Sequence, residues 1–113
     1  MSIVEKPWGY EEILETNDAY VVKKLHMRRG QRCSLQYHRK KRETIFVLSG
    51  RLKIISGPSA QNLTEHIYQA HQFITIPPKM VHRMEALEDC IYLESSSPQL
   101  TDVVRIQDDY QRA

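Results

Sequence analysis

Cysteine and long apolar runs are both scarce in this sequence, and their scarcity excludes several classes of protein. The 113 residues include only Cys33 and Cys90, too few for a disulfide framework. We expect two reduced thiols, with a single bridge between them as the alternative. No apolar run approaches the roughly 20 residues of a membrane span, and MSIVEKPWGYEE lacks the pattern of a secretory signal. The expectation is a cytoplasmic protein that contacts no membrane.

Helical periodicity is missing as well, because no stretch of about 15 residues keeps an apolar period of 3.6. Short segments rich in β-branched and aromatic residues instead recur at intervals of roughly 8–12 residues. They cover 19–27, 32–37, 43–49, 51–56, 65–70, 72–77, 81–86 and 90–95. Turn signals separate them, and Ser49-Gly50 is expected to close a tight hairpin between its two flanking strands. The pattern predicts an all-β sandwich or barrel, and the length allows a single domain.

The chain is expected to divide into a barrel core of about 19–96, an N-terminal strand arm over 1–18 and a C-terminal segment over 97–113. Within the arm, the segment from Val4 to Leu14 is interpreted as one short apolar strand. Such a strand could pair with a second copy across a two-fold axis, so a homodimer is expected. Trp8 is expected to anchor either the core or that interface. The segment 43–49 is apolar on both faces, which predicts a strand covered on both sides.

Acidic residues are absent between Lys23 and Arg42, where nine basic residues occur, although the net charge of the whole chain is only +2. A local positive field of this kind favours an anionic ligand such as a phosphate. A solvated basic face is the alternative interpretation. The segment contains few aromatic residues and has no helical spacing, so a nucleic-acid partner is not expected.

Four possible metal donors stand at informative spacings. Gln36, His38 and Glu43 belong to the pattern G-x5-Q-x-H-x4-E-x6-G, and His82 follows the Pro77-Pro78 turn. Gln36 and His38 are two residues apart on one predicted strand, so they share a face. Imidazole suits zinc, iron, nickel, copper and manganese, and amide and carboxylate oxygens favour harder ions. A set with one charged ligand leaves positive charge and open positions for water or substrate.

These residues carry a resemblance to a known family. The two patterns resemble the two cupin motifs, and the closest likeness is to the cupin domain of type II mannose-6-phosphate isomerases. The segments that match the family are Pro7-Trp8-Gly9, GQRCSLQYH at 30–38, Glu43, Ile76-Pro77, His82-Arg83 and VRIQDDYQR at 104–112. The resemblance covers nearly the whole chain.

The resemblance implies a cupin fold, that is, a double-stranded β-helix or jelly-roll barrel. It also implies a divalent metal held by Gln36, His38, Glu43 and His82, with zinc expected first and iron, manganese or nickel as alternatives. The substrate would be a small sugar phosphate, contacted by Arg32, Arg83, Arg105 and Ser34. The implied activity is a metal-dependent sugar-phosphate isomerase. The alternatives are a non-catalytic sugar-binding cupin or another metal-dependent cupin enzyme, such as an epimerase, a lyase or a dioxygenase.

The sequence departs from the family pattern at several positions. Lys40, Thr44 and Ile45 differ from the first motif, and His71, Lys79 and Ala86 differ from the second. An isomerase needs a general base, for which Lys40, among cationic neighbours, is the candidate beside Glu43. A metal-bound hydroxide or an unrecognised carboxylate is the alternative. His26, His66 and His71 fit no ligand spacing and are expected to be surface or structural residues. Lys79 is expected at the mouth of the barrel, more as a surface lysine than as a phosphate ligand.

Overall fold

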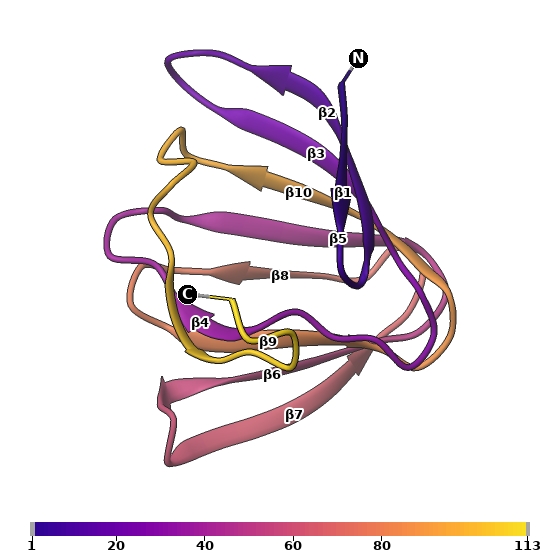
Figure 1. Ribbon diagram of the computed structural model, residues 1–113, viewed down its shortest axis with the longest axis vertical. Helices are drawn as coiled ribbons and strands as arrows, with labels where there is room; N and C mark the ends of the chain where they lie inside the picture. The colour runs from indigo at the N-terminus through magenta and orange to yellow at the C-terminus, as the bar shows by residue number, and fades with distance from the viewer. Residues whose placement is uncertain (1, 113) are drawn as a thin grey trace.

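The computed structural model describes residues 2–112, which form eleven strands and no helix (Figure 1). The strands are β1 (Ser2–Lys6), β2 (Gly9–Thr16), β3 (Val21–Met27), β4 (Leu35–Tyr37), β5 (Glu43–Ser49), β6 (Leu52–Ser59), β7 (Asn62–Tyr68), β8 (Phe73–Ile76), β9 (Val81–Ala86), β10 (Cys90–Ser96) and β11 (Val104–Gln107). One antiparallel sheet has the order β1-β2-β3-β10-β5-β8, and the other has the order β11-β4-β9-β6-β7. The expected all-β fold is therefore confirmed. Met1 and Ala113, at the outer ends of the expected arm and C-terminal segment, lie outside the described residues.

The core lies between the two sheets and is filled mainly by alternate residues of the central strands, whereas β1, β7 and β11 contribute no buried residue. In β5, Glu43, Ile45 and Val47 are buried, because successive side chains of a strand point to opposite faces. The other face of β5 is not covered, since Leu48 retains 37% exposure. The expectation that this strand is covered on both sides is wrong. The buried residues of the core cluster are Trp8, Leu25, Met27, Cys33, Ile45, Val47, Leu52, Ile54, Ile76, Met84, Ala86, Cys90 and Tyr92.

The expected hairpin at Ser49-Gly50 is also wrong, because β5 and β6 belong to different sheets. β5 pairs with β8 and β10, and β6 pairs with β7 and β9. Gly50 turns the chain from one sheet to the other with a left-handed φ of 84°. A Cβ at this position would lie 2.4 Å from the carbonyl oxygen of Asp89, so a larger residue would force the turn apart.

The N-terminal segment forms a hairpin instead of the single strand expected between Val4 and Leu14. β1 and β2 pair with each other around a turn at Pro7 and Trp8, and β2 also pairs with β3. Gly9 lets the turn approach β3 closely, because a Cβ there would lie 1.8 Å from the carbonyl oxygen of His26. Trp8 is 4% exposed and belongs to the core.

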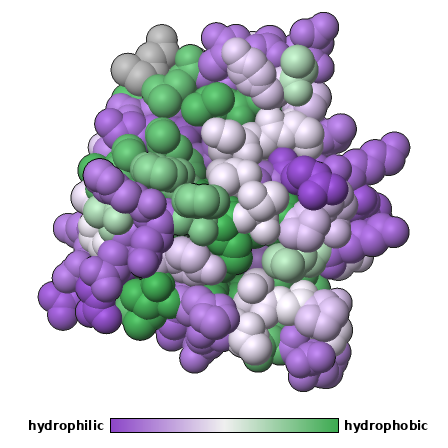
Figure 2. Space-filling model, turned by 180° about the vertical axis from the view of Figure 1, so that it is seen from behind, coloured by the Kyte–Doolittle hydropathy of each residue, from purple (hydrophilic) through white to green (hydrophobic). Residues whose placement is uncertain are grey.

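The surface keeps several large apolar side chains exposed, among them Ile67 at 46% and Phe73 at 64%. Seen from behind, hydrophobic residues gather in the upper left and centre of the molecule, with hydrophilic residues along the edges (Figure 2). Residues 2–112 contain no helix long and apolar enough to cross a membrane.

The C-terminal segment over residues 97–112 wraps along the second sheet, and none of these residues is buried. Its strand β11 pairs only with β4, at the edge of the sheet, with a shift in register after Arg105. Tyr110 packs against the core and donates a hydrogen bond of 2.6 Å to the side chain of Gln31. Polar contacts therefore hold most of this segment in place.

Candidate metal centre and adjoining cavity

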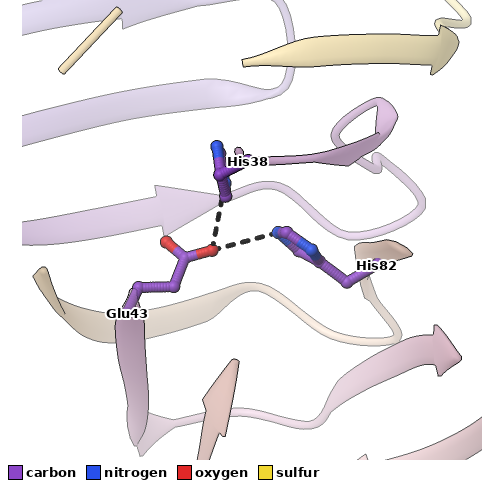
Figure 3. A group of neighbouring side chains, drawn as sticks. All are labelled: His38, Glu43 and His82. Carbon is purple, nitrogen blue, oxygen red and sulfur yellow. Dashed lines mark ion pairs between the residues drawn. The ribbon is translucent and has the colours of Figure 1, made fainter. Parts of the chain in front are cut away.

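Three of the four expected metal donors meet at one point between the sheets (Figure 3). His38 follows β4, Glu43 begins β5 and His82 lies in β9, so both sheets contribute. Oε1 of Glu43 lies 3.4 Å from Nε2 of His38 and 3.0 Å from Nε2 of His82. The three side chains are between 0% and 4% exposed. One possible ligand atom of each residue lies within 4.8 Å of the other two, an arrangement that could hold a metal ion.

The hydrogen bonds of the two imidazoles leave the Nε2 atoms of their neutral forms without a proton to donate. Nδ1 of His38 donates to the carbonyl oxygen of Asp102, and Nδ1 of His82 donates to that of Met80 at 2.9 Å. A neutral imidazole protonated on Nδ1 carries only a lone pair on Nε2. These lone pairs face Oε1 of Glu43, and all three atoms are buried without a hydrogen-bond partner. Three acceptors cannot satisfy one another, so the cluster requires a protonated imidazole or a cation.

The charges around Glu43 keep its carboxyl group ionised. Burial alone would raise the pKa of Glu43, but its contacts with His38 and His82 and the charge of Lys41 hold that pKa well below its usual range. Burial also opposes protonation of His38, yet Glu43 and the carbonyl of Asp102 outweigh burial and raise the pKa of His38. A divalent ion would take the place of this proton, because metal binding and proton release are linked.

Gln36, the fourth expected donor, lies beside this cluster. Gln36 in β4 pairs in register with His82 in β9, and paired residues of neighbouring strands point to the same face. Its Oε1 accepts a hydrogen bond from the hydroxyl of Ser34, which is fully buried. Ser34, expected at the substrate, therefore contacts Gln36 and orients its amide.

A cavity of about 120 Å³ adjoins the centre, and Gln36 and His38 form part of its wall. Five cationic side chains and two carboxylates also line it: Lys6, Lys23, Lys41, Arg105, Arg112, Glu11 and Glu94. The excess of positive charge suits an anionic ligand. Nine basic residues occur between Lys23 and Arg42, and of these only Lys23 and Lys41 line the cavity. The remaining three cations come from the two ends of the chain.

The charged residues of the cavity form a ladder of alternating sign across the inner face of the first sheet. Lys23 lies 3.3 Å from Glu11, and it pairs in register with Glu94 across β3 and β10. Nζ of Lys41 lies 3.2 Å from Glu94 and 3.6 Å from Glu43. The ladder therefore connects the cavity with the metal cluster.

Glu94 is the functional candidate that sequence reasoning missed. It is 7% exposed and lines the cavity. Burial and the nearby charge of Glu43 together outweigh the opposing charge of Lys41 and raise the pKa of Glu94 to about 7. The sequence does contain a signal for Glu94. Cys90, Tyr92 and Glu94 alternate along one strand and so share a face, and the side chains of Cys90 and Tyr92 fill the core. A carboxylate in the inward register of an apolar strand indicates a site.

The other expected site residues lie in different surroundings. Lys40 is exposed and does not line the cavity, whereas its neighbour Lys41 does. Arg32 forms a two-pronged ion pair with Asp109 on the surface. Arg83 is buried but donates to the carbonyl oxygens of Cys33 and Gln107. Of the three expected arginines, only Arg105 lines the cavity.

The remaining histidines and the cysteines lie outside the metal cluster. His26 pairs with Glu12 at 3.2 Å and stacks on Tyr10, with ring centroids 4.2 Å apart. His66 and His71 are exposed. Cys33 and Cys90 are buried free thiols.

Comparison with known proteins identifies the family of the chain. A family model described as mannose-6-phosphate isomerase C-terminal matches residues 1–108. The chain belongs to this family. Among the curated proteins related to it in sequence, the xanthan biosynthesis protein XanB of Xanthomonas campestris pv. campestris is 29% identical to this chain over 114 residues. The match includes 96% of this chain but 23% of XanB, so the chain spans about a quarter of that relative.

Solved structures show that this member of the mannose-6-phosphate isomerase C-terminal family has the cupin fold expected from the resemblance. CapF superposes on 94% of the chain with a TM-score of 0.81 and 18% identity, the match covering 34% of CapF. KdgF from Halomonas sp. gives a TM-score of 0.77 at 14% identity, with 89% of each chain covered. The oxalate decarboxylase of Bacillus subtilis, which has Mn(II) centres, gives a TM-score of 0.79 at 18% identity, covering 94% of this chain and 30% of that enzyme.

Proposed function

We propose that this protein is a metal-dependent sugar-phosphate isomerase that interconverts mannose 6-phosphate and fructose 6-phosphate. The observation that carries the proposal is the buried convergence of His38, Glu43 and His82 beside a cavity with excess positive charge. Membership of the mannose-6-phosphate isomerase C-terminal family supports the substrate class.

The donor set fits a divalent metal, because three unpartnered acceptors face one another in the interior. His38, Glu43 and His82 would hold the ion, and Gln36, which pairs in register with His82, would contribute its amide oxygen. Zinc is the expected ion, and iron, manganese or nickel is the alternative. A bound divalent ion would supply Lewis-acid polarisation of the sugar carbonyl.

The cationic wall would bind the phosphate of the substrate. Arginine binds phosphate with two parallel charge-assisted hydrogen bonds, and Arg105 and Arg112 both line the cavity. The volume of about 120 Å³ is below the roughly 300–1,000 Å³ of sites that enclose a drug-sized ligand. The cavity therefore accommodates part of a hexose phosphate, and the rest of the ligand extends toward solvent.

Aldose–ketose isomerisation moves one proton between adjacent carbon atoms of the sugar. Glu94 would accept the proton from C2 of the aldose and return it to C1, because its carboxylate lines the same cavity. The hydroxyl proton of O2 passes to O1 in the same interconversion, so that the C1 carbonyl becomes a hydroxyl and the C2 hydroxyl becomes a carbonyl. Lys41 contacts both Glu94 and Glu43 and so holds these two carboxylates in fixed positions. No oxidant or second substrate is required, since both the carbon-bound proton and the hydroxyl proton stay within the sugar and the overall formula does not change.

The test is a direct assay of the purified chain loaded with zinc or manganese. Conversion of mannose 6-phosphate to fructose 6-phosphate should be detected by nuclear magnetic resonance, with deuterium from D₂O incorporated at the exchanged carbon. His82→Ala should abolish both metal binding and conversion. Glu94→Gln should retain the metal but lose conversion, and Glu65→Gln, at an exposed glutamate of β7, should change neither. Tight binding of the sugar phosphate by loaded protein without turnover would instead identify a binding module.

A further inference from the structure

One residue of the C-terminal segment, Asp102, contacts both His38 and the loop that follows it. The backbone carbonyl of Asp102 accepts the hydrogen bond from Nδ1 of His38. Its carboxylate accepts backbone hydrogen bonds from Arg39 at 3.0 Å, Lys40 at 2.7 Å and Lys41 at 2.9 Å. These three residues belong to the loop that joins His38 to Glu43.

We propose that Asp102 is a positioning residue for the metal centre, acting on His38 and on the loop of residues 39–41. The proposal rests on the metal binding assumed in the proposed function. Asp102 does not reach the metal donors with its own carboxylate. It fixes which nitrogen of His38 carries the proton and therefore directs the Nε2 lone pair toward Glu43.

The carboxylate and the carbonyl of Asp102 act together. Three N–H groups that converge on one carboxylate form charge-assisted hydrogen bonds, which are stronger than neutral ones. They hold residue 102 against the loop, so its carbonyl oxygen stays within reach of His38. The same contacts place Lys41, whose ammonium group bridges Glu43 and Glu94. Loss of the carboxylate would leave the loop N–H groups to water and release the imidazole of His38.

The C-terminal segment depends on such contacts because none of its residues is buried. A test of Asp102 must therefore separate its effect on the metal cluster from its effect on the attachment of this segment. Asp109 provides a matched control, because it is an aspartate of the same segment that pairs with Arg32 on the surface, outside the cavity. Replacing either aspartate removes one carboxylate that anchors the segment, but of the two only Asp102 contacts His38.

The experiment measures the affinity of the full chain for Zn²⁺ and Co²⁺ by competition with a chromophoric chelator at neutral pH. Asp102→Ala should weaken metal binding about ten- to a hundredfold, the range expected when a partner of a metal ligand is lost. Asp102→Asn keeps one acceptor oxygen and should give a smaller loss. Asp109→Asn should stay within about twofold of the wild type. Thermal unfolding of each metal-free variant reports the structural effect separately, and Asp102→Asn decides the question if Asp102→Ala does not fold.

Wild-type affinity in both Asp102 variants would overturn the proposal. An equal loss in the Asp109→Asn variant would also overturn it, because the effect would then be a general loosening of the segment. The isomerase assay separates this outcome from the proposed function: loaded wild-type protein without conversion contradicts the isomerase but leaves the role of Asp102 intact. A wild-type chain that binds no metal would overturn both.

Discussion

The amide N–H of Lys79 donates a hydrogen bond of 2.6 Å to the carbonyl oxygen of His38. Lys79 makes this bond from a left-handed backbone conformation, with φ of 71°. The same turn carries Met80, whose carbonyl oxygen orients the imidazole of His82. A lysine expected as a surface residue at the barrel mouth thus belongs to a turn that contacts both histidines of the metal cluster.

Substitutions at Lys79 should separate backbone strain from side-chain chemistry. Lys79→Val should lower the free energy of unfolding by about 1–2 kcal/mol, because a β-branched residue is poorly accommodated in the left-handed region. Lys79→Gly should leave the free energy of unfolding within about 1 kcal/mol of the wild-type value. Relief of the backbone strain is offset by the greater freedom of glycine in the unfolded chain. Urea unfolding of the metal-free proteins measures both. Equal effects of the two substitutions would show that the backbone conformation at residue 79 is not the cause.

Arg105 should discriminate between phosphorylated and neutral sugars. Arg105→Gln should weaken the binding of mannose 6-phosphate about tenfold or more, the value of one charge-assisted contact. Binding of mannose itself should not change. Arg32→Gln is the control, because Arg32 pairs with Asp109 outside the cavity. Calorimetric titration provides the comparison, and an equal loss in the two variants would place the phosphate elsewhere.

Acid should weaken the C-terminal segment in a defined pH range. Hydrogen bonds from Arg112 lower the pKa of Asp108 from 3.8 to about 2. Because the pKa is lower in the folded state, the stability from this carboxylate is complete above a pH of about 4 and is lost as the pH falls toward 2. Asp108→Asn should therefore be less stable than the wild type at neutral pH, with the difference narrowing in acid. Urea unfolding at a series of pH values checks this. A constant difference at all pH values would contradict it.

Both thiols should react slowly in the folded protein. Burial raises the pKa of Cys33 to about 11 and also raises the pKa of Cys90. Because the thiolate is the reactive form, an aromatic disulfide reagent at mildly alkaline pH should label the native chain slowly and the urea-unfolded chain rapidly at both cysteines. Rapid labelling of native protein would mean that at least one thiol is accessible and ionised.

The strands and the clustering of His38, Glu43 and His82 could be predicted from local sequence, but the sheet to which each strand belongs could not. A run of β-branched and aromatic residues such as 43–49 indicates a strand, although this run is apolar on both faces and does not mark which face is buried. It does not report the partner, so the consecutive strands β5 and β6 were expected to form a hairpin although they lie in opposite sheets. Which strands pair is decided by burial between the sheets, and this involves residues far apart in the chain.

The substrate side of the site was harder to predict than the metal side. The four expected metal donors follow a recognisable spacing in the sequence. Lys40 and Lys41 are adjacent residues, and only the conformation of the loop decides which of them lines the cavity. Arg32 and Arg83 were expected at the substrate, but they contact Asp109 and backbone carbonyl oxygens of the C-terminal segment and of residue 33. A guanidinium group binds phosphate, carboxylate and carbonyl oxygen alike, so sequence alone does not determine its partner.

The position of β10 between β3 and β5 has a consequence for how the protein folds. Val21 near the start of the chain pairs with Ser96, which in turn pairs with Glu43, so the sheet cannot close until most of the chain is available. Pairings of such high sequence separation slow folding, because the entropy of a long loop is lost before any contact is gained. No fragment that ends before β10 would contain the complete barrel. A ribosome-bound chain would therefore complete the surroundings of His38, Glu43 and His82 only late in synthesis, after β10 has emerged.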